Sequence, residues 1–282
     1  MKFLIYGSKG WIGGHACTLL ISQGETVIHA KSRADDKNEV EKELLEVNPD
    51  RVMSFIGRTS GLNYNTIDYL EQKGKLIENV QDNLYGPLVL AFLCTKYGFH
   101  YTYLGTGCIF DDYTGDTGTG YSEEAEPNFF GSEYSTIKGK TDQLLHFFDD
   151  TVLNARIRMP IIGGDHPRNF ITKIMTYKKV CSIPNSMTVL PDMLPILIDM
   201  SKNKVTGTIN LTNPGLITHN EILDMVKELI DPSFTYENFT LEEQSKVLLG
   251  GRSNNQLNTD KLQKMYPDIL PIKEAVRRIL TK

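Results

Sequence analysis

The sequence combines a tyrosine with a lysine four residues later, in Tyr134-Ser-Thr-Ile-Lys138. On a helix this spacing places the two side chains on one face, one turn apart. A neighbouring ammonium lowers the pKa of a phenol, so that the phenol can exchange a proton with a carbonyl oxygen. The same pattern also occurs by chance on ordinary helix surfaces, and the pair therefore needs support from the rest of the chain.

A hydroxyl and a thiol stand close together in a second stretch, Leu104-Gly-Thr-Gly-Cys-Ile-Phe-Asp111. The alternating aromatic run before them predicts a buried strand over residues 101–104, which places Thr106 near its end. Taken alone, Cys108 is most simply a small core residue. A thiol beside a cation can, however, also exchange a proton with a weak carbon acid.

Alternating strands and helices must position these residues. Apolar runs predict strands at residues 2–6, 26–30, 52–56, 101–104 and 152–157, and helical patterns cover residues 11–23, 38–47, 75–97 and 132–148. This alternation predicts an α/β fold with a doubly wound parallel sheet. After Pro160, prolines punctuate shorter elements, with isolated helices at 221–230 and 241–248. We therefore expect a Rossmann domain over residues 1–160 and a smaller substrate domain over 161–282, with segments that can interleave.

A glycine-rich turn follows the first predicted strand, in Gly7-Ser-Lys-Gly10-Trp-Ile-Gly13. Glycines there permit a tight turn and close approach of the backbone to a pyrophosphate, which the N-terminus of the next helix attracts. A glycine-rich turn without a ligand is the simpler alternative. Because this one lies at the first strand-to-helix junction of an alternating chain, we expect a dinucleotide site.

The residues after the second strand favour one of the two nicotinamide cofactors. An acid there would bind the ribose hydroxyls of NAD, whereas a basic group accommodates the 2′-phosphate of NADP. The chain has Lys31-Ser-Arg33 at this point, and Lys9 adds a cation in the glycine turn. A solvated basic turn is the alternative interpretation. We expect NADPH, with NADH as the less preferred cofactor.

Composition and charge argue against several other classes of protein. The chain has 282 residues and a net charge of −5, which argues against a nucleic-acid-binding protein. Its four cysteines are widely separated, so we predict neither a disulfide framework nor a metal site. No apolar stretch is long enough to cross a bilayer, and the first residues already read as a strand instead of a secretion leader. The expected location is the cytoplasm.

Taken together, the motifs resemble two nested families. The spacing Gly-x-x-Gly-x-x-Gly, with Tyr-x-x-x-Lys and a strand-end threonine, is similar to that of the extended short-chain dehydrogenase/reductases. Across nearly the whole chain, further motifs resemble the plant-type bifunctional UDP-4-keto-6-deoxyglucose 3,5-epimerase/4-reductases of UDP-L-rhamnose synthesis. These motifs are Thr106-Gly-Cys-Ile-Phe, Pro127-Asn-Phe, Arg158-Met-Pro-Ile, Pro167-Arg-Asn-Phe-Ile-Thr-Lys-Ile, Ile183-Pro-Asn-Ser-Met-Thr, Thr212-Asn-Pro-Gly, His219-Asn-Glu-Ile-Leu, Asp231-Pro-Ser-Phe, Asn238-Phe-Thr-Leu-Glu-Glu-Gln and Arg252-Ser-Asn-Asn. The chain departs from the family in a shorter loop at 111–122 and in Gly57-Arg58-Thr59, which replaces an alanine-glycine stretch.

The resemblance implies one pocket with two activities. A reductase triad of Thr106, Tyr134 and Lys138 would be supported by Asn83, for which a helix-surface amide is the alternative. Cys108 and Lys173 would be the epimerising pair, with their individual roles unassigned. Implied cofactor contacts are Gly7, Lys9, Gly10, Trp11, Ile12, Gly13, Arg33, Gly57, Arg58, Tyr134, Lys138 and Pro160. Implied substrate contacts are Asn169, Asn185, Arg252 and Asn254, with the guanidinium of Arg252 on the diphosphate.

Two alternative functions stay open. A plain 4-reductase would act on a ketone that is already epimerised, as in the dTDP-rhamnose route, and would not need Cys108. A regulatory relative would bind NADPH and a partner protein without catalysis, although the intact triad argues against it. For the bifunctional enzyme, UDP-4-keto-6-deoxyglucose would come from a separate 4,6-dehydratase. The choice between UDP and dTDP is open, as is the choice between a monomer and a homodimer.

Overall fold

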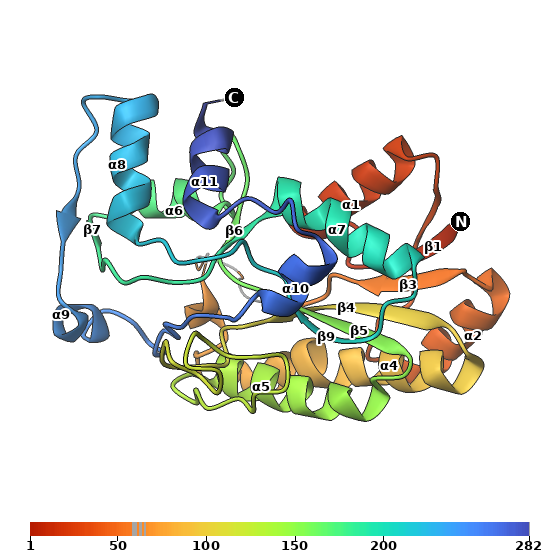
Figure 1. The fold of residues 1–282 in the computed structure, drawn as a ribbon. Helices are drawn as coiled ribbons and strands as arrows, with labels where there is room; N and C mark the ends of the chain where they lie inside the picture. Colours follow the sequence, from red (N-terminus) through yellow and green to blue (C-terminus); the bar gives the residue numbers. More distant parts are fainter. Residues whose placement is uncertain (58–60, 62–63, 65, 282) are drawn as a thin grey trace.

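A six-stranded parallel sheet forms the centre of the protein (Figure 1). The computed structural model describes residues 1–57, 61, 64 and 66–281. The strands are β1 (Lys2–Tyr6), β2 (Thr26–His29), β3 (Arg51–Ser54), β4 (His100–Thr106), β5 (Val152–Ile157) and β9 (Gly207–Asn210), in the order β2-β1-β3-β4-β5-β9. The strand order reverses at β1, which pairs with β2 on one side and with β3 on the other. Such a reversal opens a crevice at the carboxyl ends of the strands.

Helices cover both faces of this sheet. One face carries α1 (Trp11–Ser22) and α7 (Leu190–Lys202), and the other carries α2 (Lys37–Val47), α4 (Gly86–Tyr97) and α5 (Glu133–Leu145) (Figure 1). Each layer encloses its own hydrophobic cluster. Because both sheet faces are buried, the central strands read as nearly continuous apolar runs. The predicted α/β fold with a doubly wound parallel sheet is confirmed.

A further hydrophobic cluster lies in the C-terminal half, between elements at the upper left of Figure 1. It joins α6 (Phe170–Thr176), α8 (His219–Leu229) and α11 (Ile272–Leu280) to the paired short strands β6 (Pro160–Ile161) and β8 (Thr188–Val189). The remaining elements are β7 (Lys179–Val180), β10 (Glu237–Asn238), α9 (Leu241–Ser245) and α10 (Asp260–Met265). Because α7 and β9 pack on the main sheet, the two halves of the chain interleave. A domain boundary at residue 160 stays a prediction.

Two segments differ from the sequence prediction. The helix expected over 75–97 consists of α3 (Leu76–Val80), a π-helical turn (Gln81–Tyr85) and α4. The segment that contains Pro191 and Pro195 is α7, although prolines there suggested short, broken elements. Pro191 lies in the first helical turn, where a missing N–H is harmless, and Pro195 removes only one hydrogen bond. Burial of one apolar face of α7 on the sheet outweighs that loss.

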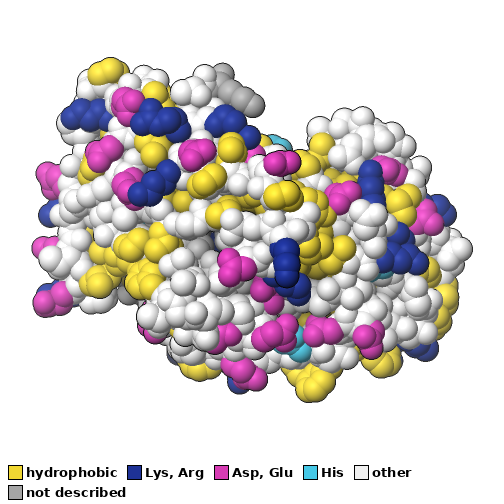
Figure 2. All heavy atoms as spheres, in the orientation of Figure 1, with side chains coloured by type: hydrophobic (Ala, Val, Ile, Leu, Met, Phe, Trp, Pro, Cys, Tyr) yellow, Lys and Arg dark blue, Asp and Glu magenta, His cyan; other side chains and the backbone are white. Residues whose placement is uncertain are grey.

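The surface in view carries both signs of charge. Basic and acidic side chains are interspersed over the face in Figure 2, without a continuous basic area. This face therefore offers no extended site for a phosphate backbone. Within the described part of the chain, every helix is too short or too polar to cross a lipid bilayer.

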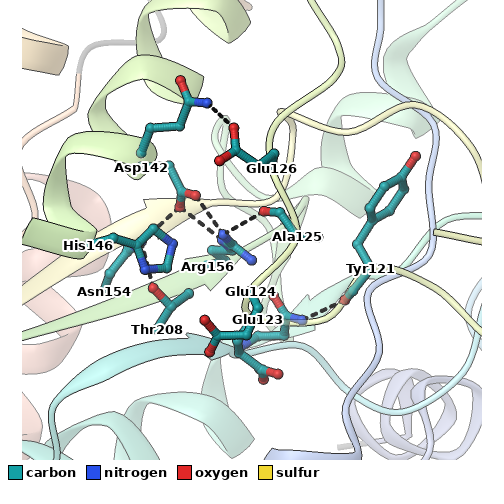
Figure 3. A network of polar contacts seen from close by, with 12 residues as sticks. Tyr121, Glu123, Glu124, Ala125, Glu126, Asp142, His146, Asn154, Arg156 and Thr208 are labelled. Carbon is teal, nitrogen blue, oxygen red and sulfur yellow. Dashed lines mark hydrogen bonds and ion pairs between the residues drawn. The ribbon is translucent and has the colours of Figure 1, made fainter. Parts of the chain in front are cut away.

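A buried ion pair fixes α5 to the sheet (Figure 3). Arg156 of β5 donates from Nη2 to Oδ2 of Asp142 at 2.5 Å and from Nε to Oδ1 at 2.9 Å. Asn154 adds a hydrogen bond to Oδ1 at 2.7 Å, and Nη1 of Arg156 donates to the carbonyl of Ser122 at 3.0 Å. Both partners are almost completely buried, so water competes little with these bonds.

Removal of one partner should therefore destabilise the fold strongly. We expect Asp142→Ala to lower the free energy of unfolding by about 3–5 kcal/mol, because it leaves a buried guanidinium without its counter-ion. Urea denaturation followed by circular dichroism measures this. The matched control is Glu228→Ala, which breaks an exposed pair with Arg277 and should change little. Equal losses in the two variants would contradict the role of the buried pair.

Candidate active site

The carboxyl ends of the central strands open into one cavity of about 1590 Å³. Segments after β1, β3, β4 and β5 line it from the sheet, and α6 with residues 252–254 lines it from the C-terminal half. Predicted site residues that line this cavity are Gly7, Lys9, Gly10, Trp11, Ile12, Gly13, Arg33, Gly57, Thr106, Cys108, Tyr134, Lys138, Pro160, Lys173, Arg252 and Asn254. Asn169 and Asn185 are not among the lining residues, and Arg58 lies outside the described residues.

The glycine turn has the geometry that a dinucleotide pyrophosphate needs. Gly7 has a φ of +73°, and a Cβ on Gly13 would lie 2.2 Å from the carbonyl oxygen of Gly7. Helix α1 begins directly after Gly10 without a side-chain cap and without an acid in its first turn. Its first N–H groups can therefore serve an anion, and the turn fits a nicotinamide dinucleotide.

Acidic side chains accompany the basic turn after β2. Arg33 forms a bidentate pair with Asp35, at 2.9 and 3.0 Å, and its side chain is 69% exposed. Glu43 of α2 accepts hydrogen bonds from the N–H groups of Lys31 and Ser32, at 2.7 and 3.2 Å. The sequence analysis missed Glu43, because it lies 12 residues after Lys31 and no motif connects the two positions. Arg33 therefore lines the cavity as an exposed cation that is oriented by its ion pair with Asp35.

The start of α5 positions the tyrosine. Ser132 caps the helix by accepting a hydrogen bond from the N–H of Ser135, at 3.1 Å. Glu71 accepts from the N–H groups of Glu133 and Tyr134, at 2.9 and 3.2 Å, so a carboxylate also neutralises the helix N-terminus. These contacts fix the first turn, and the Tyr134 phenol is hydrogen-bonded to the Thr106 side chain at the end of β4.

The pKa of Tyr134 is raised, not lowered as the Tyr-x-x-x-Lys motif alone predicts. Burial is the main cause, the charge of Cys108 adds to it, and the hydrogen bond with Thr106 opposes it. The ammonium of Lys138 donates to the Tyr103 hydroxyl and lies 4.5 Å from the centre of that ring. Burial lowers the pKa of Lys138 to about 8, against the attraction of Asp142. The two groups share a helix face, but in this arrangement the lysine is held by a second tyrosine that the motif does not include.

Cys108 lies at the triad and also packs against the small hydrophobic cluster that contains Tyr134. Its N–H donates to Oγ1 of Thr106 at 3.1 Å, which turns the chain back toward the end of β4. The charge of the thiol acts on both Tyr134 and Lys138, and Cys108 is the least buried of the four cysteines. Lys173 lines the cavity from α6, where burial and then the charge of Arg168 lower its pKa to about 8.

Three of the asparagines that the sequence singles out are buried. Asn83, in the π-helical turn, is completely buried and donates to Asn79 at 2.9 Å, so the helix-surface interpretation was wrong. Asn169 donates to the carbonyls of Ile162 and Gly164, at 3.1 and 2.9 Å. Asn185 donates to Oδ1 of Asn254, at 2.9 Å, and so holds a residue that lines the cavity. For Asn169 and Asn185, contact with the substrate stays a prediction.

Arg252 is paired with a buried acid. Its Nη2 lies 2.6 Å from Oδ2 of Asp68, and Nη1 donates to the carbonyl of Gly250 at 2.7 Å. The other oxygen of Asp68 accepts from the N–H groups of Leu249 and Gly250. The sequence analysis missed Asp68, which orients Arg252 at the cavity wall. The role of Arg252 at a diphosphate stays a prediction.

Comparisons with known proteins agree with this geometry. Residues 3–161 match the NAD dependent epimerase/dehydratase family. The chain is 58% identical to the uncharacterised protein L780 of Acanthamoeba polyphaga mimivirus, over 100% of this chain and 98% of that protein. It is 44% identical to the bifunctional dTDP-4-dehydrorhamnose 3,5-epimerase/dTDP-4-dehydrorhamnose reductase of Arabidopsis thaliana, over 98% and 91%. A trifunctional UDP-glucose 4,6-dehydratase/3,5-epimerase/reductase of the same plant is 43% identical, and the chain covers 41% of its length.

A solved structure is also closely similar. The crystal structure of the L780 UDP-rhamnose synthase superposes with a TM-score of 0.97 at 57% identity, over 100% of this chain and 99% of that one. The resemblance to extended short-chain reductases and to bifunctional epimerase/reductases, predicted from the motifs, is confirmed. Because the family match covers more than half of the chain and the relatives align along nearly all of it, the protein belongs to the NAD dependent epimerase/dehydratase family.

Proposed function

We propose that this chain is a 3,5-epimerase and NADPH-dependent 4-reductase that converts UDP-4-keto-6-deoxyglucose to UDP-L-rhamnose. The observation that carries the proposal is one cavity lined by the reductase triad, Cys108 and Lys173. A plain 4-reductase needs no thiol there, whereas an epimerase needs two groups that exchange protons with the sugar ring. The activities in the names of the mimivirus and Arabidopsis relatives support the same assignment.

Epimerisation uses groups from two different parts of the fold. Hydrogens on carbons 3 and 5 flank the 4-ketone and are acidic, because loss of either proton gives an enolate. Inversion requires that a proton leaves from one face of the ring and returns to the other. Cys108 follows β4 and Lys173 lies on α6, so the two side chains approach the cavity from the sheet and from the C-terminal half. This placement suits one proton-exchanging group on each ring face.

The raised pKa of Tyr134 suits it for holding the oxygen of the ketone. A phenol that stays protonated donates a hydrogen bond, and this bond strengthens as negative charge develops on the enolate oxygen. Thr106 supplies a second hydroxyl at the same point. When NADPH is bound, it supplies the hydride for carbon 4. Tyr134 then gives its proton to the oxygen, and Lys138, an ammonium below about pH 8, supplies positive charge on the same helix face.

The cofactor and the substrate source complete the proposal. The glycine turn would hold the pyrophosphate, while Lys9 and Arg33 would favour the 2′-phosphate of NADPH. We assign the preceding dehydration to a separate 4,6-dehydratase. The trifunctional Arabidopsis relative supports this order of reactions, since its name combines the same three activities in one longer protein.

The two activities should be separable by mutation. We expect Cys108→Ser to abolish exchange of ring hydrogens with deuterated water, because an alcohol is a much poorer base near neutral pH. Reduction of an already epimerised 4-keto-L-rhamnose nucleotide should survive, since the triad is intact. Tyr134→Phe should lose reduction while some exchange persists. NMR of each variant with both ketones and NADPH measures product and deuterium incorporation.

Wild-type protein and circular dichroism of both variants provide the controls. Equal loss of both reactions in a normally folded Cys108→Ser protein would show that Cys108 has only a packing role. Wild-type reduction of the epimerised ketone without any ring exchange would favour a plain 4-reductase.

Lys173 should change its protonation near pH 8. Below this pH the ammonium dominates and can return a proton, and above it the amine can remove one. The rate of acetylation by acetic anhydride, followed by mass spectrometry of the Lys173 peptide, should therefore rise with a midpoint at about pH 8. Arg168→Gln removes a positive charge that disfavours the ammonium, so the midpoint should move to higher pH. Arg277→Gln, on α11, is the matched control, and an identical midpoint in both variants would refute the effect of Arg168.

Arg33→Asp should shift the cofactor preference from NADPH toward NADH. The substitution removes a cation from the cavity wall and repels a 2′-phosphate. We expect the ratio of kcat/KM for NADPH to that for NADH to fall by roughly tenfold or more, the effect of losing a hydrogen bond to a charged group. Arg277→Asp, an exposed arginine away from the cavity lining, is the control. An unchanged ratio of the two kcat/KM values would show that Arg33 does not take part in cofactor binding.

A further inference from the structure

Arg158 is a buried cation at the carboxyl edge of the sheet, directly after β5. It is 1% exposed and lines the same cavity as Cys108. Its Nη1 and Nη2 donate to the backbone carbonyls of Asn255 and Ser253, at 3.0 and 2.9 Å. Neutral carbonyls hold the group in place but do not neutralise its positive charge.

The charge of Arg158 is balanced differently from that of Arg156. Arg156 has Asp142, whereas within residues 1–57, 61, 64 and 66–281 no carboxylate forms an ion pair with Arg158. An unpaired buried charge is strongly unfavourable, and burial lowers the pKa of Arg158. The first group that opposes this shift is Cys108, through its charge. Asp111 and Tyr113 act more weakly. In the same described part of the chain, Nε of Arg158 has no hydrogen-bond partner.

The backbone brings the thiol and the guanidinium together. A Cβ on Gly107 would lie 3.1 Å from both Cγ and Cδ of Arg158, so the arginine passes against the turn that carries Cys108. The side chain of Asn255 donates to the carbonyls of Gly107 and Phe110, both at 2.9 Å. The segment that holds Arg158 therefore also holds the thiol-bearing turn, and the two groups are positioned as one unit.

Two other cations that line the cavity, Lys138 and Lys173, are in different electrostatic surroundings. Lys138 donates to Tyr103 and is attracted first by Asp142. For Lys173, burial and then the like charge of Arg168 disfavour the ammonium. For Arg158, by contrast, the charge of Cys108 is the first influence that opposes the effect of burial.

We propose that Arg158 is the positioning residue that stabilises the thiolate of Cys108 and so makes it the base of epimerisation. This inference rests on the proposed function. The thiolate takes a proton from carbon 3 or 5, so that a C–H bond breaks and an S–H bond forms. The electron pair passes into the enolate, whose oxygen Tyr134 and Thr106 hold. The Lys173 ammonium returns a proton on the opposite face, and the resulting thiol and amine exchange with solvent before the second inversion. Arg158 keeps its protons throughout.

Two variants separate charge from structural support. Arg158→Lys keeps a cation, and Arg158→Gln keeps a donor for the carbonyls but has no charge. The primary measurement is the rate of Cys108 alkylation by iodoacetamide at neutral pH, followed by peptide mass spectrometry with buried Cys181 as an internal reference. We expect Arg158→Gln to slow alkylation and ring-hydrogen exchange by roughly tenfold or more, as loss of a nearby opposite charge predicts. Arg158→Lys should retain most of both rates, and reduction of the epimerised ketone should be largely unaffected.

The outcomes distinguish this inference from the proposed function. Unchanged alkylation in a folded Arg158→Gln protein would overturn the inference and make Arg158 only a clamp for the loop. Slower alkylation in a protein whose wild type shows no ring exchange would uphold the thiolate contact and refute the epimerase function.

A comparison of two alkylating reagents on the unsubstituted protein tests the proposal even if the Arg158 variants do not fold. A guanidinium beside the sulfur favours an anionic reagent. The ratio of the alkylation rate by iodoacetate to that by iodoacetamide should therefore be higher at Cys108 than for free cysteine. The preference should persist in Lys138→Met and Lys173→Met. A ratio equal to that of free cysteine would overturn the proposal.

Discussion

The ion pair between Asp142 and Arg156 is the constraint on which the geometry of the site depends. Tyr134, Lys138 and Asp142 follow one another at intervals of four residues, and so they share one face of α5. When β5 holds Asp142, it also sets the height and rotation of the other two side chains above the sheet. The same arginine binds the carbonyl of Ser122, which ties the loop after β4 to this point. A pair buried far from solvent therefore aligns the chemical groups at the cavity.

The arginines around this sheet differ in what balances their charge. Arg156 has a carboxylate within a buried hydrogen-bonded network, as expected of a residue that supports the fold. Arg252 has Asp68, which fixes it at the edge of the cavity. Arg158 has backbone carbonyls and a thiol. Three arginines, two of them only two positions apart in the chain, thus have distinct physical roles that their contacts reveal.

Local patterns were sufficient for the sheet and for the main chemical groups. Strands that are buried on both faces can be recognised in the sequence as apolar runs. These runs also mark the strand and helix ends near which Thr106, Cys108 and Tyr134 lie. Residues brought in from distant parts of the chain were not predictable in this way. Glu43, Asp68 and the Tyr103 contact of Lys138 arise from packing between elements, which no spacing along the chain encodes. Helix α7 was missed because its prolines outweighed its apolar face in the sequence but not in the folded protein.

The hydrogen bonds from Asn255 to Gly107 and Phe110 have a consequence for the order in which the protein matures. They join residues 148 and 145 positions apart, and the carbonyls that bind Arg158 lie 97 and 95 positions further along the chain. During synthesis on the ribosome, the first five strands of the main sheet are complete long before residues 253–255 leave the exit tunnel. The dinucleotide half can therefore assemble early, while the thiol-bearing turn waits for one of the last segments to emerge. A nascent chain would acquire its cofactor cradle well before it acquires a fixed Cys108.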